Sequence, residues 1–242
     1  MNEIERIKEA YGRRKIDRKG RIYSYLNEAN LFMIHQRERK LLDTFGRFKI
    51  TSFSDRKILD VGCGGGGLLR ELVKYGARPE NLYGIDLLEE RIEEAKYLSP
   101  NIDFRCGDAS SLPYNDGFFD IVTQFTLFTS ILDITMKKRI ALEMLRLLKS
   151  DGIIIWYDFH KDNPKNPDVR GVKKKEIFEL FPNCTIYLKA VTLAPPISRI
   201  LVPFSVILCE LLEKFPFLCT HYLGVIRRNK DGRLRKFRGM LV

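Results

Sequence analysis

The sequence lacks an uninterrupted apolar run long enough to cross a membrane. Its most apolar region, residues 197–223, is broken by Arg199, Glu210, Lys214 and two prolines, whereas a membrane-spanning helix needs about 20 consecutive apolar residues. Residues 1–14 are charged and show no signal-peptide pattern. We therefore expect a cytoplasmic protein without a transmembrane segment. A peripheral contact of residues 197–223 with a membrane surface stays open.

Cysteine and histidine are scarce, with five and three residues in a chain of 242. No two cysteines form a CxxC pair, and no cluster of cysteine and histidine has the spacing of metal ligands. A disulfide framework and a zinc site are thus disfavoured, and we predict no metal site. The five cysteines are interpreted as buried thiols.

Positive charge is in excess, because 42 Lys and Arg outweigh 31 Asp and Glu and give a net charge of +11. Such a chain attracts anions, which include nucleic acid, lipid headgroups and nucleotide-linked sugars. Two basic runs, residues 13–21 and 227–238, are interpreted either as nucleic-acid arms or as solvated tails. The charge alone does not choose among these partners.

Apolar residues make up 45% of the chain, which is ample for a core. Apolar residues at helical spacing predict two N-terminal helices, one around Ile4, Ile7 and Tyr11 and one around residues 31–45. From residue 56 onward, short β-type runs alternate with helical segments, a pattern typical of a mostly parallel α/β sheet covered on both faces. We assign residues 1–50 to a helical lid, 51–228 to the main domain with a helical insertion at 192–218, and 229–242 to a basic tail.

A glycine-rich segment, ILDVGCGGGG, leads from a predicted strand directly into a helix. Glycine at such a turn permits positive φ and a close approach of ligand to backbone. Acidic residues stand at the ends of three successive strands, namely Asp60, Asp86 and Asp108. Each acid alone is explained by a turn or a helix cap, but three at one sheet edge favour a nucleotide-type cofactor. Asp86 is suitably placed for ribose hydroxyls.

These motifs resemble the class I S-adenosylmethionine-dependent methyltransferases, of the type 11 kind. The resemblance rests on residues 60–66, 84–86, 107–109, 119–122 and 147–152. It implies a Rossmann-like, doubly wound sheet of seven strands, the last one, at about 221–227, antiparallel. It also implies S-adenosyl-L-methionine as cofactor. The expected cofactor-binding residues are Asp60, Gly62, Cys63, Gly64, Gly66, Asp86, Leu87, Asp108, Ala109 and Gln124.

A nicotinamide-dinucleotide domain is the main alternative for the glycine turn. Its pyrophosphate would rest on a helix N-terminus reached through G-x-G-x-x-G, whereas the spacing here is G-x-G-G-G-G. The acid at position 60 suits a cofactor with a cationic ammonium group. No second substrate domain for hydride transfer is visible, so methyl transfer is favoured.

The segment after the fourth strand, residues 123–127, is expected to border the transferring methyl group. Its sequence, TQFTL, lacks the Asn-Pro-Pro-Tyr type of motif with which related enzymes grip a planar amine, and the chain has no Pro-Cys nucleophile. A hydroxyl oxygen is therefore the best default acceptor. The protein mainly has to orient that acceptor toward the cofactor.

The stretch WYDFHKDNPKNPDVRG follows the fifth predicted strand at the same sheet edge. We predict Asp158 and His160 as catalytic residues, because a histidine with an ordinary pKa near 6.5 suits a general base. Asn163 and Arg170 are predicted to bind a polyhydroxyl acceptor. The equally acceptable alternative is a capped turn followed by a solvated loop.

A looser resemblance links residues 23–42 and the C-terminal region to methyltransferases associated with surface-polysaccharide and glycoconjugate biosynthesis. It implies a sugar or lipid-linked sugar as acceptor and a lid that contains Tyr25, Asn27, Asn30 and Gln36, with Tyr25 contacting the substrate. RNA methylation and a non-catalytic scaffold that binds the cofactor are the alternatives, since a fold does not guarantee activity. The oligomeric state is left open.

Overall fold

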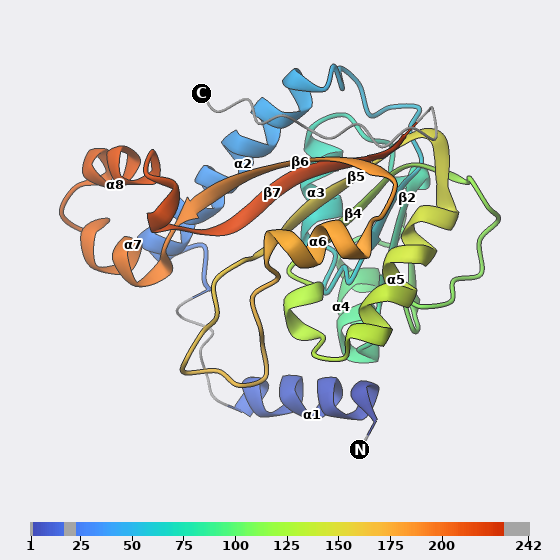
Figure 1. Ribbon diagram of the computed structural model, residues 1–242, viewed down its shortest axis with the longest axis horizontal. Coiled ribbons are helices and arrows are strands. Elements are labelled where there is room, and N and C mark those ends of the chain that lie inside the picture. The colour runs from blue at the N-terminus through green and yellow to red at the C-terminus, as the bar shows by residue number, and fades with distance from the viewer. Residues whose placement is uncertain (1, 17–22, 230–242) are drawn as a thin grey trace.

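A computed structural model describes residues 2–16 and 23–229. A twisted sheet of seven strands forms its centre, in the order β3-β2-β1-β4-β5-β7-β6 (Figure 1). The strands are β1 (Ile58–Val61), β2 (Leu82–Asp86), β3 (Asp103–Cys106), β4 (Phe119–Phe125), β5 (Leu148–Phe159), β6 (Cys184–Leu193) and β7 (Cys219–Arg228). Strands β1 to β5 pair in parallel, and β7 pairs antiparallel with both β5 and β6.

Helices cover both faces of the sheet (Figure 1). One core cluster contains buried residues of α1 (Glu3–Ile16), α5 (Ile134–Leu147) and α6 (Lys174–Leu180). The opposite cluster contains buried residues of α2 (Glu28–Arg47), α3 (Gly67–Lys74) and α4 (Glu89–Leu98). A third, smaller cluster joins the start of α2 to α7 (Pro195–Leu201) and α8 (Val206–Glu213). Short 3-10 turns lie at Pro79–Asn81, Phe128–Ser130 and Pro216–Leu218.

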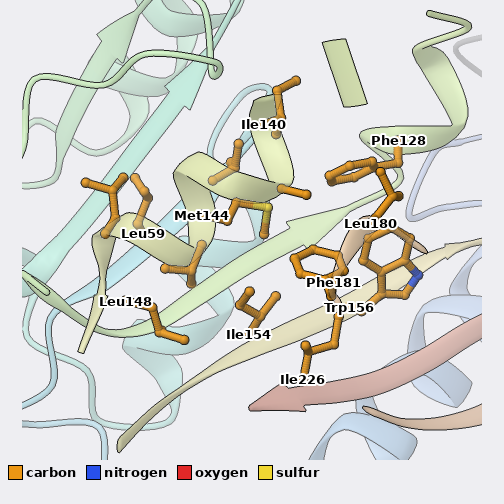
Figure 2. Packing of buried hydrophobic residues seen from close by; sticks show 14 of the residues in the cluster. Leu59, Phe128, Ile140, Met144, Leu148, Ile154, Trp156, Leu180, Phe181 and Ile226 are labelled. Carbon is orange, nitrogen blue, oxygen red and sulfur yellow. The ribbon is translucent and has the colours of Figure 1, made fainter. Parts of the chain in front are cut away.

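Strand β5 shows why a continuous apolar run belongs at the centre of this sheet. Successive side chains point to opposite faces, so Ile154 and Trp156 enter one core cluster while Ile155 and Tyr157 enter the other. Trp156 is fully buried, with its ring 4.8 Å from that of Phe128 (Figure 2). This packing fixes the carboxyl end of β5, where a ligand of an open α/β sheet is expected to bind.

The predicted doubly wound α/β fold is confirmed, including the antiparallel last strand and the helical insertion, which forms α7 and α8 between β6 and β7. The predicted lid, residues 1–50, comprises α1 and α2, which pack on opposite faces of the sheet. Most of the predicted basic tail (residues 230–242) and part of the first basic run (17–22) lie outside the described residues.

The interpretation of all five cysteines as buried thiols is wrong for Cys106, which is exposed at the end of β3, and for Cys184, which is half-buried at the start of β6. Within the described ranges, no group of three His, Cys, Asp or Glu residues is arranged to hold a metal ion. No helix in the part of the chain that the structure describes is both long and apolar enough to span a bilayer.

Candidate functional site

The glycine-rich turn after β1 has the backbone that its sequence predicts. Gly62, Gly64 and Gly66 have φ values of +76°, +53° and +77°, in the left-handed region that favours glycine. The N–H groups of Gly62 and Cys63 both donate to the carbonyl oxygen of Ile85, at 2.8 and 2.9 Å. These two hydrogen bonds hold the turn against the end of β2, just before α3 begins.

Gly62 lies where a side chain would obstruct the site. A Cβ atom built on it would be 2.9 Å from Cδ1 of Leu127, closer than normal van der Waals contact. Both residues also line the principal pocket of the described molecule. Glycine at position 62 therefore keeps the pocket open and permits the positive φ.

Asp86 is held by two backbone N–H groups at the end of β2. Its two carboxylate oxygens accept hydrogen bonds from Gly64 N at 2.9 Å and from Leu88 N at 3.0 Å. An ionised carboxylate has about four lone-pair sites, so Asp86 can still accept bonds from a ligand. Asp86 lines the pocket and is thus oriented for recognition of hydroxyl groups.

The pocket encloses about 670 Å³ and opens to solvent. Four expected cofactor-binding residues besides Gly62 line it, namely Asp86, Leu87, Asp108 and Ala109. The carboxylate of Asp108 is oriented by Ser110, whose N–H and hydroxyl each donate to it at 2.8 Å. Two fixed acids beside apolar side chains fit a ribose and an adenine ring, so the residues present fit S-adenosylmethionine.

Asp60 lies below the glycine turn and is buried. It accepts a hydrogen bond from the hydroxyl of Thr123 at 2.7 Å. Burial raises the pKa of this carboxyl to about 7, and the negative charge of Asp86 contributes in the same direction. A buried acid without a paired cation suits a cationic ligand group, but Asp60 is not among the described residues that line the pocket.

Four other expected cofactor residues are also not among the described residues that line the pocket, namely Cys63, Gly64, Gly66 and Gln124. Cys63 is buried, and desolvation raises the pKa of its thiol well above the ordinary range. Gln124 is fully buried and accepts a hydrogen bond from Leu127 N at 3.2 Å. Gln124 therefore supports the segment that faces the site.

Helix α1 forms one wall of the pocket, a feature that the sequence reasoning missed. Ile7 and Tyr11, four residues apart on one helix face, both line it. The hydroxyl oxygen of Tyr11 lies 3.0 Å from that of Ser130, and the guanidinium of Arg91 lies 4.5 Å from the centre of the Tyr11 ring. Arg6 also donates to the carbonyl oxygen of Ser130 at 2.7 Å. The helical spacing of Ile7 and Tyr11 was the available signal, although it could not name the surface that they cover.

The predicted catalytic residues Asp158 and His160 are not among the described residues that line the pocket. Asp158 is buried and accepts hydrogen bonds from Thr129 N at 3.2 Å and from Phe159 N at 2.8 Å. Burial raises its pKa to about 7. Since Thr129 precedes the pocket residue Ser130, the geometry gives Asp158 a positioning role at the turn.

His160, which directly follows β5, is also buried. Its ring stacks on Tyr222 with 4.2 Å between ring centres, and its backbone N–H donates to Thr220 O. Desolvation lowers its pKa. In this arrangement its imidazole faces β7, so direct contact of His160 with a ligand in the pocket is not supported.

The residues expected to bind the acceptor do not converge. Tyr25 is 62% exposed, Asn163 forms a turn by accepting from Lys165 N, and Arg170 pairs with Glu176 at 2.9 Å. Asn27 caps α2, and the side chain of Asn30 donates to the carbonyl oxygens of Tyr23 and Ser24. Gln36 is fully buried and accepts a hydrogen bond from Leu193 N. None of these six residues lines the described pocket.

A row of aromatic rings extends from the pocket across the sheet edge. Phe125, which lines the pocket, stacks on Tyr157 at 5.2 Å, and Tyr157 stacks on His221 at 4.6 Å. Arg37 of α2 lies 5.8 Å above the Phe125 ring and pairs with Glu71 of α3. Buried aromatic rings therefore lie behind the pocket residue Phe125.

The strands and turns that form the pocket match a known protein family. Residues 59–156 match the model of a family described as "Methyltransferase domain". The match runs from β1 to β5 and includes the glycine turn and all three strand-end acids.

Curated relatives cover the same region. Ajmaline N-methyltransferase of Rauvolfia serpentina is 33% identical over 129 residues, which are 50% of this chain and 42% of the relative. Ubiquinone biosynthesis O-methyltransferase of Bartonella bacilliformis is 31% identical over 103 residues, 41% of this chain and 40% of the relative. The chain thus spans less than half the length of these relatives.

Solved structures share the fold. Geranyl diphosphate C-methyltransferase from Streptomyces coelicolor A3(2), in complex with Mg²⁺, geranyl diphosphate and S-adenosyl-L-homocysteine, superimposes with a TM-score of 0.57. The alignment covers 78% of this chain and 75% of that one at 13% identity. At that identity the likeness extends to the fold alone.

Proposed function

We propose that this chain, whose central domain belongs to the class I S-adenosylmethionine-dependent methyltransferases, transfers the methyl group of the cofactor to a hydroxyl oxygen of a sugar, a lipid-linked sugar or another small metabolite. The observation that carries methyl transfer is the joint geometry of Gly62 and Asp86. A turn with positive φ opens the pocket, and a carboxylate fixed by two N–H groups lines it.

In this proposal, Asp86 accepts hydrogen bonds from the ribose hydroxyls, and Leu87 and Ala109 pack against the adenine ring. Asp108 receives the exocyclic amine, and the cationic amino-acid end of a bound cofactor would favour the ionised form of the buried Asp60. When bound, the cofactor supplies an activated methyl group on a sulfonium. The remaining task of the protein is to orient the acceptor and exclude water.

The acceptor is assigned to the end of the pocket near Phe125, Thr126 and Ser130. The ring of Phe125, which lines the pocket, supports an acceptor with an apolar or ring-shaped surface, because flat rings bury such surfaces well. The hydroxyls of Thr126 and Ser130 offer hydrogen bonds to a hydroxylated group. Asp158 contributes by holding the backbone of Thr129 beside this end.

Oxygen is favoured over nitrogen because residues 123–127 lack a motif that grips a planar amine. The ubiquinone biosynthesis O-methyltransferase among the relatives supports an oxygen acceptor. The ajmaline N-methyltransferase and the geranyl diphosphate C-methyltransferase have other acceptor atoms, so the reacting atom has to be tested directly.

The decisive experiment incubates the purified chain with methyl-labelled S-adenosylmethionine and separate pools of nucleotide sugars, lipid extract, small metabolites and total RNA. We expect label in a sugar, lipid or metabolite pool, in a methyl ether identified by mass spectrometry. Label on nitrogen or carbon would contradict the oxygen acceptor. Label confined to RNA and lost at high salt would instead assign RNA methylation. Cofactor binding without transfer to any pool would assign a scaffold role.

A further inference from the structure

The helical insertion presents large apolar side chains to solvent at one end of the molecule. Helices α7 and α8, with the turns that join them to β7, project beyond the edge of the sheet (Figure 1). Phe204, Ile207 and Phe217 are 84%, 72% and 71% exposed. We call residues 195–218 the apolar knob; its exposed members include Ile200, Phe204, Ile207, Leu211, Phe215 and Phe217.

The exposed apolar side chains of the knob are concentrated within one short segment of the chain. Single exposed apolar side chains are normal on a soluble protein, whereas contiguous patches mark interaction sites. In α8, only Cys209 is buried, while Ile207 and Leu211 point outward. The start of α2 packs against α7 in the same cluster, and Leu26, two residues before α2, is 96% exposed. Folding therefore leaves the knob unpartnered within the described residues.

Charge around the knob is biased to positive. Glu210 pairs with Arg39 at 2.8 Å, and Glu213 approaches Lys40 at 3.5 Å, so α2 neutralises both acids of α8. The exposed Arg199 and Lys214 form no ion pair with another residue of the described ranges. Apolar side chains beside free cations are typical of surfaces that lie on anionic membranes.

We propose that the apolar knob docks on a membrane surface that contains anionic lipids. The apolar side chains would enter the boundary between headgroups and acyl chains, while Arg199 and Lys214 contact lipid phosphates. A second copy of this chain fits less well, because each copy carries a net charge of +11 and the knob is convex. Nucleic acid would leave the apolar side chains in water.

The knob is connected to the candidate site through the aromatic row. Helix α7 begins two residues after β6, where the hydroxyl of Thr192 lies 2.9 Å from that of Tyr157. Tyr157 stacks on the pocket residue Phe125. These contacts join the knob to the pocket end near Phe125, and we extend the proposal to a lipid-borne acceptor. This last consequence rests on the proposed function, whereas docking itself does not.

Vesicle co-sedimentation of the full chain tests the docking, with vesicles of phosphatidylcholine alone or mixed with phosphatidylglycerol. We expect binding to the mixed vesicles. The double variant Phe204→Ser/Ile207→Ser should weaken it roughly tenfold or more, because each substitution removes a large apolar side chain from the docked surface. Arg199→Glu/Lys214→Glu should weaken binding to mixed vesicles and leave the binding to neutral ones unchanged.

The matched control is Tyr97→Ser/Leu142→Ser, which removes two exposed apolar side chains from α4 and α5. This variant should bind vesicles as the unmodified chain does. Equal loss in the control, or failure of the unmodified chain to bind either vesicle, would overturn the proposal. So would a dimer, seen by light scattering, that only Phe204→Ser/Ile207→Ser dissociates. Cofactor affinity, measured in parallel by calorimetry, should be the same in all variants as in the unmodified chain. If the unmodified chain did not bind the cofactor, that result would count against the proposed function and not against docking.

Discussion

The carboxylate of Asp86 accepts a hydrogen bond from the backbone N–H of Gly64 at 2.9 Å. This bond joins the acid at the end of β2 to the glycine turn after β1, and a second bond from Leu88 N at 3.0 Å fixes the other oxygen. The two segments, which both contribute residues to the pocket, are therefore joined by hydrogen bonds. A change at either residue is expected to alter both.

Asp86→Ala should lower the affinity for S-adenosylmethionine by about tenfold or more, since hydrogen bonds to a charged group contribute about 1.5–3 kcal/mol each. The variant removes the proposed ribose acceptor and frees the Gly64 N–H. Isothermal calorimetry measures the effect. Asp103→Ala, which removes a half-buried acid that pairs with Arg105 on β3 and does not line the pocket, should bind the cofactor normally. Unchanged binding in Asp86→Ala would refute the placement of the cofactor.

Gly62→Ala tests whether the open space at the turn is required. Its φ of +76° is unfavourable for alanine, and the new Cβ would meet Leu127 Cδ1 at 2.9 Å. Gly76→Ala is a matched control, because Gly76 has φ +90° with no atom within 4 Å of the new Cβ. Both variants should lose about 1–2 kcal/mol of stability from the left-handed backbone, seen in urea denaturation. Only Gly62→Ala should also lose cofactor affinity.

Tyr11→Ala tests the wall that α1 adds to the pocket. The variant removes the ring beneath Arg91 and the contact with Ser130, so we expect faster dissociation of the cofactor while the central fold is retained. Stopped-flow fluorescence competition measures the dissociation rate. Lys8→Ala, at an exposed position of the same helix, should dissociate at the unmodified rate. An equal rate in both variants would show that α1 does not retain the cofactor.

The sequence was sufficient to predict residue positions that depend on local strand-end geometry. Gly62, Asp86 and Asp108 follow directly from the positions at which three parallel strands end, and parallel strand ends share one sheet edge. The backbone of Gly62 and the side chains of Asp86 and Asp108 reach the pocket because the paired parallel strands bring them to the same edge of the sheet. The order of strands and helices likewise predicts the class of fold.

The sequence was insufficient where contacts join distant segments. Asp158 and His160 were placed correctly near the end of β5, but β7 pairs beside them, with Asp158 opposite Tyr222. That pairing encloses both side chains away from the pocket. Tyr11 contacts Ser130, which is 119 residues away in the sequence. No local spacing pattern predicts a contact between segments so far apart. The exposure of the apolar knob also could not be predicted, because apolar composition is equally typical of a buried helix.

Asp60 should make folding stability depend on pH. Its pKa is about 7 in the folded chain, chiefly through burial, and about 3.9 when unfolded. Between these values the folded state holds a proton that the unfolded state has released, so stability falls as pH rises from about 4 to about 7. Asp60→Asn keeps an acceptor for the Thr123 hydroxyl and removes this titration. The free energy of unfolding of Asp60→Asn minus that of the unmodified chain should therefore increase as pH rises from about 4 to about 7. The increase should be up to about 1.4 kcal/mol per pH unit. Urea denaturation at pH 4.5, 6 and 7.5 measures the difference, and an equal pH dependence of the variant and the unmodified chain would contradict the prediction.

His221 should act with the opposite sign. Burial lowers its pKa to about 3, and the charges of His160 and Arg37 contribute to the shift. Below about pH 6.5 the His221 imidazole is protonated in the unfolded state but stays neutral in the folded state. Folding stability is therefore lost as pH falls toward 3. His221→Phe preserves a ring between Tyr157 and Phe159 and cannot titrate. Relative to the unmodified chain, it should gain up to about 1.4 kcal/mol per pH unit between pH 6.5 and 4.5, measured by urea denaturation. The exposed His35→Gln is the control and should follow the unmodified chain; if His221→Phe did so too, the imidazole would titrate normally in the folded protein and the aromatic row would be open to water.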